Sequence, residues 1–196
     1  MAHSVNSRVA LSPSGPPGPA PLDGPLARGA AAGQASDMKR TRELRPLSSE
    51  HHQALLVAFQ LKKGLAGHPE AAGAPKDLPG LLTHARRFDE QLFRTHARAE
   101  EELLGTCITA GDMARLRTEH AELTRLLEAA RTARPVELRA HLSAYADLLD
   151  RHVRWEEREL FPYAEDHADE ATLAAIGGEL ERRLVVARGE AKGARK

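Results

Sequence analysis

The sequence predicts an all-α protein: an up-down-up-down four-helix bundle with a disordered N-terminal leader and a short C-terminal fifth helix. Three observations support this fold class. Apolar residues recur every three or four positions in long segments, prolines and glycines separate these segments, and no segment alternates as a β-strand does. Hydrophobic residues make up 41% of the chain but aromatic residues only 4%, so the core must consist mainly of leucine and alanine.

The chain divides into four parts by composition. Residues 1–40 are rich in proline, glycine, serine and alanine, and such a stretch buries too little apolar surface to offset the entropy of ordering it. We therefore expect a disordered leader there. The bundle is predicted at 44–166, an amphipathic helix packed on it at 167–190, and a flexible tail at 191–196.

The first two bundle helices are predicted from residues three or four positions apart, which form a stripe on the inner face of each helix. The first stripe comprises Leu47, His51, Leu55, Phe59 and Lys62. We expect Ser48 or Ser49 to cap the start of this helix, and the helix to end between Gly64 and Gly67. The second helix is predicted at 81–104. Its stripe comprises Leu81, Ala85, Phe88, Leu92, His96, Glu100 and Leu103.

The other two bundle helices lie on either side of Pro135. The third begins near Asp112 and stops before this proline, with a stripe of Met113, Leu116, His120, Leu123 and Leu127. The fourth starts just after it, with a stripe of Leu138, Leu142, Tyr145, Leu149, His152 and Glu156. Pro162 is expected to bend or end the fourth helix. The fifth helix is predicted at 170–188.

Charge and cysteine content limit the classes of partner. The chain has 28 basic and 28 acidic side chains, which argues against nucleic acid or an anionic membrane held by bulk electrostatics. Neither a membrane-spanning run nor an apolar secretion segment is present, so we expect a soluble, cytoplasmic protein. The single cysteine, Cys107, excludes an internal disulfide framework, and we interpret it as a small structural residue.

A doubled motif carries the predicted chemistry. His96 to Glu101 and His152 to Glu157 share the pattern His-x-x-x-Glu-Glu. Each copy follows a helix with a Glu-His pair, at Glu50-His51 and Glu119-His120. A repeat of this kind is expected when two helical hairpins build one site between them.

The spacing of these residues indicates a metal site. Side chains at i and i+4 are neighbours on a helix, so a His and a Glu so placed can reach one cation. The donors lie early in the first and third helices and late in the second and fourth, which brings them to one end of the bundle. Ionisable groups on an apolar stripe are costly unless paired or metal-bound. The candidate ligands are His51, His96, Glu100, His120, His152 and Glu156.

Simpler interpretations exist for several of these residues. The His–Glu pairs could be surface ion pairs, His52 could replace His51, and His120 could be an ordinary core histidine. His84 and His141 lie about 16–18 Å from the motif along their helices, too far to share the site. The remaining residues considered are interpreted as leader, loop, surface or core positions, and they are His3, His68, His167, Glu101, Glu157 and Tyr145. Glu101 and Glu157 could also act as outer partners of the site.

These motifs resemble the hemerythrin-like (HHE cation-binding) family. The resemblance covers roughly residues 44–185 and includes the Leu-Phe-Pro at 160–162. It implies a non-haem di-iron centre in which Glu100 and Glu156 bridge the irons and the histidines supply the imidazoles. Imidazole with carboxylate suits iron, manganese or zinc, and the resemblance favours iron over the other two.

The chain departs from the oxygen-carrying members of that family. They have a second histidine one turn away on the third helix, where this chain has Leu116 and Thr124, and an aspartate five residues after the fourth helix's histidine, where it has Glu156 at four. Fewer ligands leave open positions, so we expect sensing, storage or detoxification of O2, NO or peroxide. The alternative is a di-iron oxidoreductase of peroxidase, oxidase, ferroxidase or iron–sulfur-repair type. A metal-free structural or interaction bundle is the third possibility.

Overall fold

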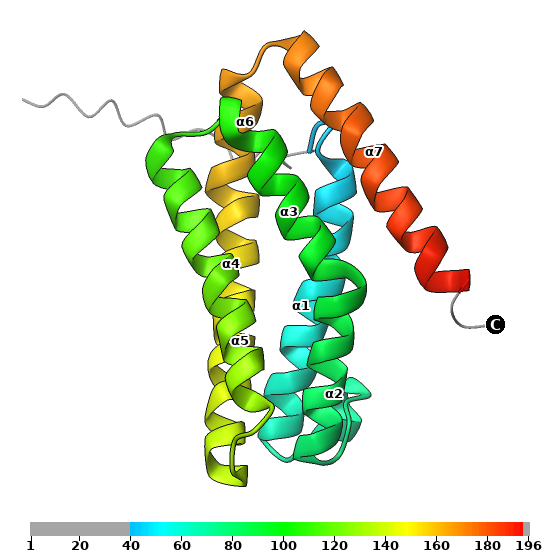
Figure 1. Ribbon diagram of the computed structural model, residues 1–196, viewed down its shortest axis with the longest axis vertical. Coiled ribbons are helices and arrows are strands. Elements are labelled where there is room, and N and C mark those ends of the chain that lie inside the picture. The colour runs from blue at the N-terminus through cyan, green and yellow to red at the C-terminus, as the bar shows by residue number, and fades with distance from the viewer. Residues whose placement is uncertain (1–39, 194–196) are drawn as a thin grey trace, which may run out of the picture. The chain divides into compact units, whose positions relative to one another are not determined.

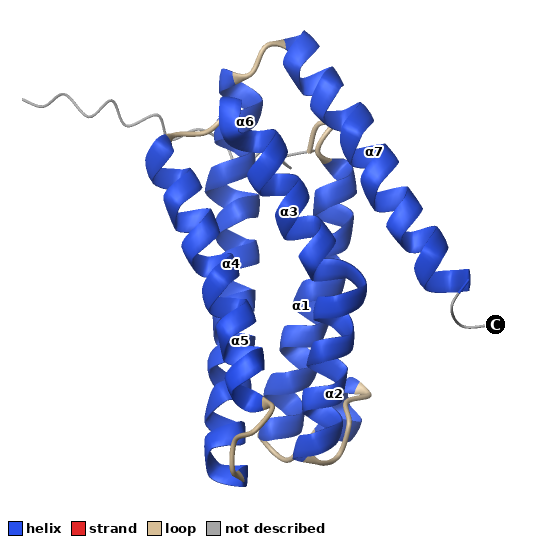
Figure 2. Cartoon of the chain, in the orientation of Figure 1, coloured by secondary structure: helices blue, strands red, loops and turns tan. Residues whose placement is uncertain are grey.

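The computed structural model describes residues 40–193 of the chain. Residues 1–39 of the leader predicted at 1–40, and residues 194–196 of the tail predicted at 191–196, lie outside the described residues. The helices are α1 (Arg45–Leu65), η1 (Pro69–Ala72), α2 (Leu78–Phe88), η2 (Asp89–Phe93), α3 (Arg94–Leu103), η3 (Leu104–Thr106), α4 (Ala110–Ala130), α5 (Pro135–Trp155), η4 (Glu156–Leu160), α6 (Phe161–His167) and α7 (Glu170–Gly193). Between residues 40 and 193 there is no strand, which confirms the all-α class (Figure 2).

The described helices form four rods and a covering helix. In Figure 1, α1 runs downward, α2 and α3 return upward as one rod, α4 runs downward, and α5 with α6 returns upward. α5 packs along both α1 and α4, whereas α3 approaches α4 over a shorter stretch. This is the predicted up-down-up-down bundle.

Helix α1 starts earlier than predicted. It begins at Arg45, with Leu44 at the N-cap and Pro46 in the first turn, so neither Ser48 nor Ser49 is the cap. Proline suits this position because the first N–H groups of a helix have no partner within it. The predicted stripe is also wrong at Phe59, which is 45% exposed, because the inner face turns through Ala54, Ala58 and Leu61 instead.

A π-helical turn, η2, changes which residues of the second bundle helix face inward, so the predicted stripe is wrong at Leu92. The turn inserts one extra residue, so the helix re-registers between Phe88 and His96. Phe93 is buried as a result (3% exposed), and Leu92, which the periodicity placed inward, is only half-buried. A regular 3.6-residue period cannot predict this shift, because the extra residue is visible only in the backbone hydrogen bonds.

A second π-helical turn, η4, carries the last rod past Pro162. α6 continues directly from this turn, with Pro162 in its first turn, so the proline does not end the rod. Within an α-helix the proline ring meets the carbonyl four residues earlier. The wider turn bonds Phe161 N–H to the carbonyl of Glu156, five residues back.

The apolar core is divided into two clusters by a polar layer. The larger cluster includes Leu123, Tyr145 and Leu149. The smaller includes Leu116, Trp155 and the buried Cys107, which agrees with a structural role for that cysteine. The buried charged and polar side chains in the register between them are Glu50, His51, His96, Glu100, His120, His152 and Glu156.

Helix α7 confirms the predicted fifth helix and is longer than expected. It continues past Arg188 to Gly193 and packs against α3 and α1. Its buried Ile176, Leu180 and Leu184 join the smaller core cluster. No helix between residues 40 and 193 combines the length and apolar character needed to cross a bilayer.

Gly177 lies where α7 packs against the segment before α1. A Cβ atom at Gly177 would lie 2.9 Å from Cα of Glu43, whereas one at Gly178 would meet nothing within 4 Å. Gly177→Ala is therefore expected to destabilise the protein by about 1–3 kcal/mol through overpacking. Gly178→Ala is the matched control and should stabilise it by about 0.5–1 kcal/mol, because alanine favours a helix interior. Denaturant unfolding measures both, and equal effects would contradict the packing.

Candidate metal centre

The six predicted ligands converge in two overlapping groups of donors. His51, His96, Glu100 and Glu156 form one group, and Glu100, His120, His152 and Glu156 form the other. Within each group the donor atoms lie within 4.8 Å of one another, and all these residues are buried. The six side chains that the sequence predicts as ligands therefore lie close together in the structure.

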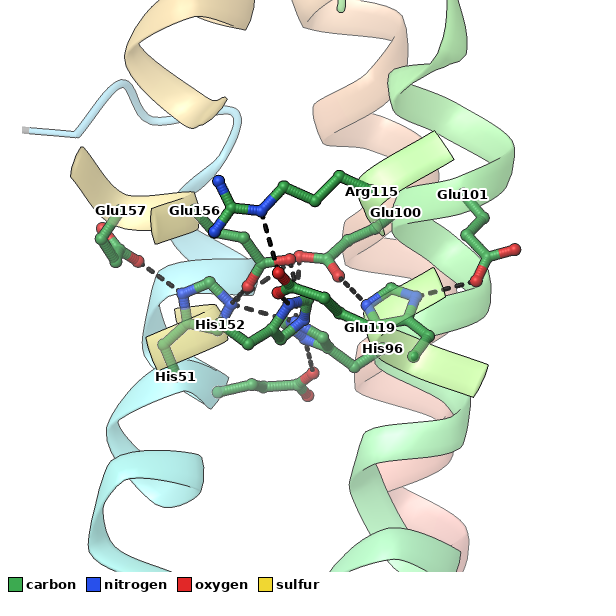
Figure 3. Close-up of polar contacts among 11 residues, drawn as sticks. His51, His96, Glu100, Glu101, Arg115, Glu119, His152, Glu156 and Glu157 are labelled. Carbon is green, nitrogen blue, oxygen red and sulfur yellow. Dashed lines mark hydrogen bonds and ion pairs between the residues drawn. The ribbon is translucent and has the colours of Figure 1, made fainter. Parts of the chain in front are cut away.

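The two inner carboxylates face both groups at once. Glu100 Oε1 lies 3.0 Å from Nε2 of His96, and its Oε2 lies 3.4 Å from Nε2 of His120. Glu156 Oε1 lies 3.1 Å from Nε2 of His152, and its Oε2 lies 3.2 Å from Nε2 of His51. Figure 3 shows Glu100 and Glu156 meeting at the centre of the cluster. Each group thus has two imidazole nitrogens and one oxygen from each carboxylate.

Two outer carboxylates orient the histidines of α1 and α4. Nδ1 of His51 lies 2.6 Å from Glu157 Oε1, and Nδ1 of His120 lies 2.8 Å from Glu101 Oε1. Because an ionised carboxylate only accepts hydrogen bonds, each Nδ1–H donates and each Nε2 keeps its lone pair for the centre. Glu101 and Glu157 lie at opposite flanks in Figure 3, in the outer role that the sequence left open for them.

The other two histidines have carboxylate partners that the sequence reading missed. Nδ1 of His96 lies 3.0 Å from Glu50 Oε2, and Nδ1 of His152 lies 2.9 Å from Glu119 Oε2. The available signal was the repeated Glu-His dipeptide. Each of these glutamates directly precedes the ligand candidate of its own helix and orients the histidine of the neighbouring one.

The donor set fits a cation. Nε2 of His51 and Nε2 of His96 face each other at 3.1 Å, and two lone pairs so close repel unless a positive charge lies between them. Two imidazole nitrogens held at roughly 2.1 Å from one cation and about 90° apart are roughly 3 Å from each other. Within residues 40–184, both oxygens of Glu100 and Glu156, and Nε2 of His120 and His152, are buried without a hydrogen-bond partner. Such atoms are costly unless a ligand satisfies them.

Without a cation, neighbouring carboxylates stabilise the protonated form of His51, His96 and His120. Burial lowers the pKa of His96, but the charge and hydrogen bonds of Glu100 and the bond to Glu50 outweigh it and raise the pKa to about 9. Burial likewise opposes protonation of His51 and His120, and their carboxylate neighbours raise both pKa values. Burial raises the pKa of Glu157 and Glu119, yet hydrogen bonds from His51 and His152 respectively lead the effects that lower it to about 2 in each.

The remaining described histidines stay outside the centre. His52 is exposed beside the buried His51, which settles the choice between them. His84 is half-buried and bonds Gln60 Oε1 at 2.7 Å, and His141 is also half-buried. His68 and His167 are exposed, as predicted. His3 lies outside the described residues.

Arg40 fixes the surroundings of His51. Its guanidinium donates at 2.8 Å to Glu157 Oε2 and at 2.9 Å to Glu165 Oε2. It also lies over the Phe161 ring, 5.1 Å from the centroid, and that ring stacks on His51 at 5.2 Å. The last residue of the predicted leader therefore holds both the hydrogen-bond partner and the stacking partner of a candidate ligand.

Replacing Arg40 is expected to weaken metal binding at the His51 group. Arg40→Gln frees Glu157 to move away from Nδ1 of His51, and loss of an outer partner typically costs 10- to 100-fold in metal affinity. Arg42→Gln is the control, because Arg42 is exposed two residues away. Competition with a chelator of known affinity measures the change. An Arg40→Gln protein that matches the Arg42→Gln protein would contradict the positioning role.

The fold and the site together define a helical bundle with a buried histidine–carboxylate cluster that could hold metal ions. A sequence model of the family described as Hemerythrin HHE cation binding domain matches residues 111–182 of this chain. The match confirms the resemblance to the hemerythrin-like family. The match covers α4 from Gly111, α5, η4, α6 and part of α7, and so includes His120, His152 and Glu156. His51, His96 and Glu100 lie outside it, and the repeat and the geometry assign them to the cluster. Comparison with curated proteins and with solved structures found no match.

Proposed function

We propose that this protein holds a non-haem di-iron centre and uses it to bind O2, NO or peroxide. The proposed ligands are His51, His96, Glu100, His120, His152 and Glu156. The observation that supports it most is the arrangement of the two inner carboxylates, each with one oxygen toward each histidine pair. Such carboxylates can bridge two ions, and two ions also neutralise the buried negative charge.

The donor types suit iron, and the resemblance to the hemerythrin-like family favours iron over manganese or zinc. Each proposed position has two imidazole nitrogens and two carboxylate oxygens, a mixture typical of non-haem iron sites, whereas structural zinc sites mostly use thiolates. An iron ion held by these four donors would keep coordination positions open for a small molecule. When bound, the iron supplies reversible redox chemistry and an exchangeable coordination position.

The protein's own residues orient and shield the centre. The four outer carboxylates hold the imidazole tautomers, as described above. Phe93 and Phe161 pack against the rings from the two core clusters. These groups restrict the access of bulk water to the donors from the two core clusters, which hinders loss of the metal.

Metal analysis with a visible spectrum tests the proposal. Protein purified without oxygen is expected to contain close to two iron ions per chain and to gain an oxygen-dependent charge-transfer band on exposure to air. His152→Gln should lose most of the iron, and His141→Gln, on the same helix but outside the cluster, should keep it. Pure protein without tightly held transition metal would contradict the proposal.

Turnover separates binding from catalysis at the same site. A sensor, store or buffer reverses its spectral change when the oxygen, NO or peroxide is removed, and consumes little of it. An oxidoreductase consumes peroxide or oxidises ferrous iron over many cycles. Multiple-turnover assays on the iron-loaded protein therefore decide between the proposed function and the di-iron oxidoreductase, which the open positions also permit.

A further inference from the structure

A surface cavity lies against one side of the cluster. It occupies about 410 Å³ in the seam between α3 and α4. Ala97, Ala121 and Thr124 are among its lining residues, and it reaches His120 and Phe93. The small side chains of Ala97, Ala121 and Thr124, and the short stretch over which α3 and α4 pack, leave this space open. The other lining residues are charged and comprise Arg94, Arg98, Glu101, Glu102 and Arg117.

Phe93 forms the inner wall of this cavity. Its ring lies 5.5 Å from the His120 ring and 6.3 Å from the rings of His96 and His152. Phe93 also lines the small void on the other side of the ring, next to His51 and His96. The Phe93 side chain thus lies between the open cavity and the void beside His96, whereas His120 itself lines the cavity.

The opposite half of the cluster is closed by larger groups. In the repeat, His51 corresponds to His120, so Ala121 corresponds to His52, Thr124 to Leu55 and Ala97 to Val153. The last pair shows the difference most directly, because both side chains are buried and valine is the larger. Phe161 stacks on the His51 ring with an interplanar angle of 9°, and Arg40 lies over Phe161.

We propose that the cavity between α3 and α4 is the entrance for the small molecule and that this molecule binds on the His120–His152 side of the centre. Phe93 sets the size limit at the inner wall. This inference rests on the proposed function and adds which of the two positions receives the ligand. The His51–His96 side serves to hold its ion behind Phe161 and Arg40.

A tryptophan at the cavity rim tests the entrance. Ala121 is exposed and lines the cavity, so Ala121→Trp should cover it. His52→Trp is the matched control, because it occupies the exposed repeat-equivalent position on the closed side. The probe is azide added to oxidised, iron-loaded protein, followed by stopped-flow absorbance. We expect Ala121→Trp to slow both association and dissociation roughly tenfold or more, as gating of access does, and to leave the equilibrium constant unchanged.

A third variant tests the inner wall. Phe93→Ala is expected to speed azide association and to admit bulkier anions. Iron content and melting temperature of every variant show whether the centre and the fold are intact, independently of ligand kinetics.

The outcomes separate the inference from the proposed function. Suppose that the wild-type protein forms an azide complex, but that Ala121→Trp forms it at the wild-type rate or His52→Trp slows it equally. The proposed entrance is then wrong, and the proposed di-iron centre is unaffected. If the wild-type protein holds iron but its spectrum is unchanged by azide, the inference fails. If it holds no iron, the proposed function fails and the inference falls with it.

Discussion

Glu156→Gln is expected to remove nearly all bound metal from the protein. The carboxylate of Glu156 offers one oxygen to each histidine pair, and it is completely buried. Glutamine keeps the size of the side chain, but its neutral amide is a weak ligand and cannot balance the charge of two cations. Loss of an outer partner costs 10- to 100-fold in affinity, so loss of a shared inner carboxylate should cost more than about 100-fold.

The control for this substitution lies in the same π-helical turn. Glu159 is exposed, three residues after Glu156, and Glu159→Gln should retain the wild-type metal content. Metal analysis after gel filtration measures both proteins, and far-ultraviolet circular dichroism verifies that the helices are intact. Full metal occupancy in a folded Glu156→Gln protein would show that this carboxylate is not shared between two ions.

The metal-free protein is expected to lose stability as the pH rises from about 6.5 to about 9. The pKa of His96 is raised to about 9, whereas an unfolded histidine has a pKa near 6.5. A raised pKa contributes stability that is fully present below the unfolded value and is lost as the pH rises through the folded value. The difference amounts to about 3 kcal/mol in the free energy of unfolding.

Metal binding should show the opposite dependence on pH over the same range. Each Nε2 must lose its proton before it binds a cation, so metal affinity rises as the pH approaches 9. Denaturant unfolding of chelated protein at several pH values measures the first effect, and chelator competition measures the second. His96→Gln should flatten the stability profile, although His51 and His120, whose pKa values are also raised, keep part of the slope. His52→Gln should retain the full slope, and a flat wild-type profile would contradict the prediction.

The candidate ligands could be predicted because the helical i, i+4 spacing and the tandem repeat of the chain indicate the same residues. The i, i+4 spacing of His96 with Glu100 and of His152 with Glu156 is the helical repeat itself, and both pairs follow apolar stripes. The tandem repeat then supplied His51 and His120 by correspondence. Local spacing was sufficient here because each pair is organised within a single turn of a single helix.

The π-helical turns and the outer carboxylates show where such reasoning stops. Phe93 and not Leu92 is buried because η2 holds one extra residue. The four Nδ1–carboxylate bonds join residues on different helices. These contacts depend on the rotation and axial offset of one helix against another, which no spacing within a helix records.

The sequence by itself determined the helical class and the order of the four bundle helices, because backbone periodicity and side-chain chemistry are local properties. It also predicted the six inward donors, with His52 left as an alternative to His51. Only the tertiary structure decided that each inner carboxylate faces both histidine pairs, that Arg40 braces the His51 side, and that a cavity opens toward His120. Those features arise from packing between segments far apart in the chain, where distances of a few tenths of an ångström decide which atoms meet.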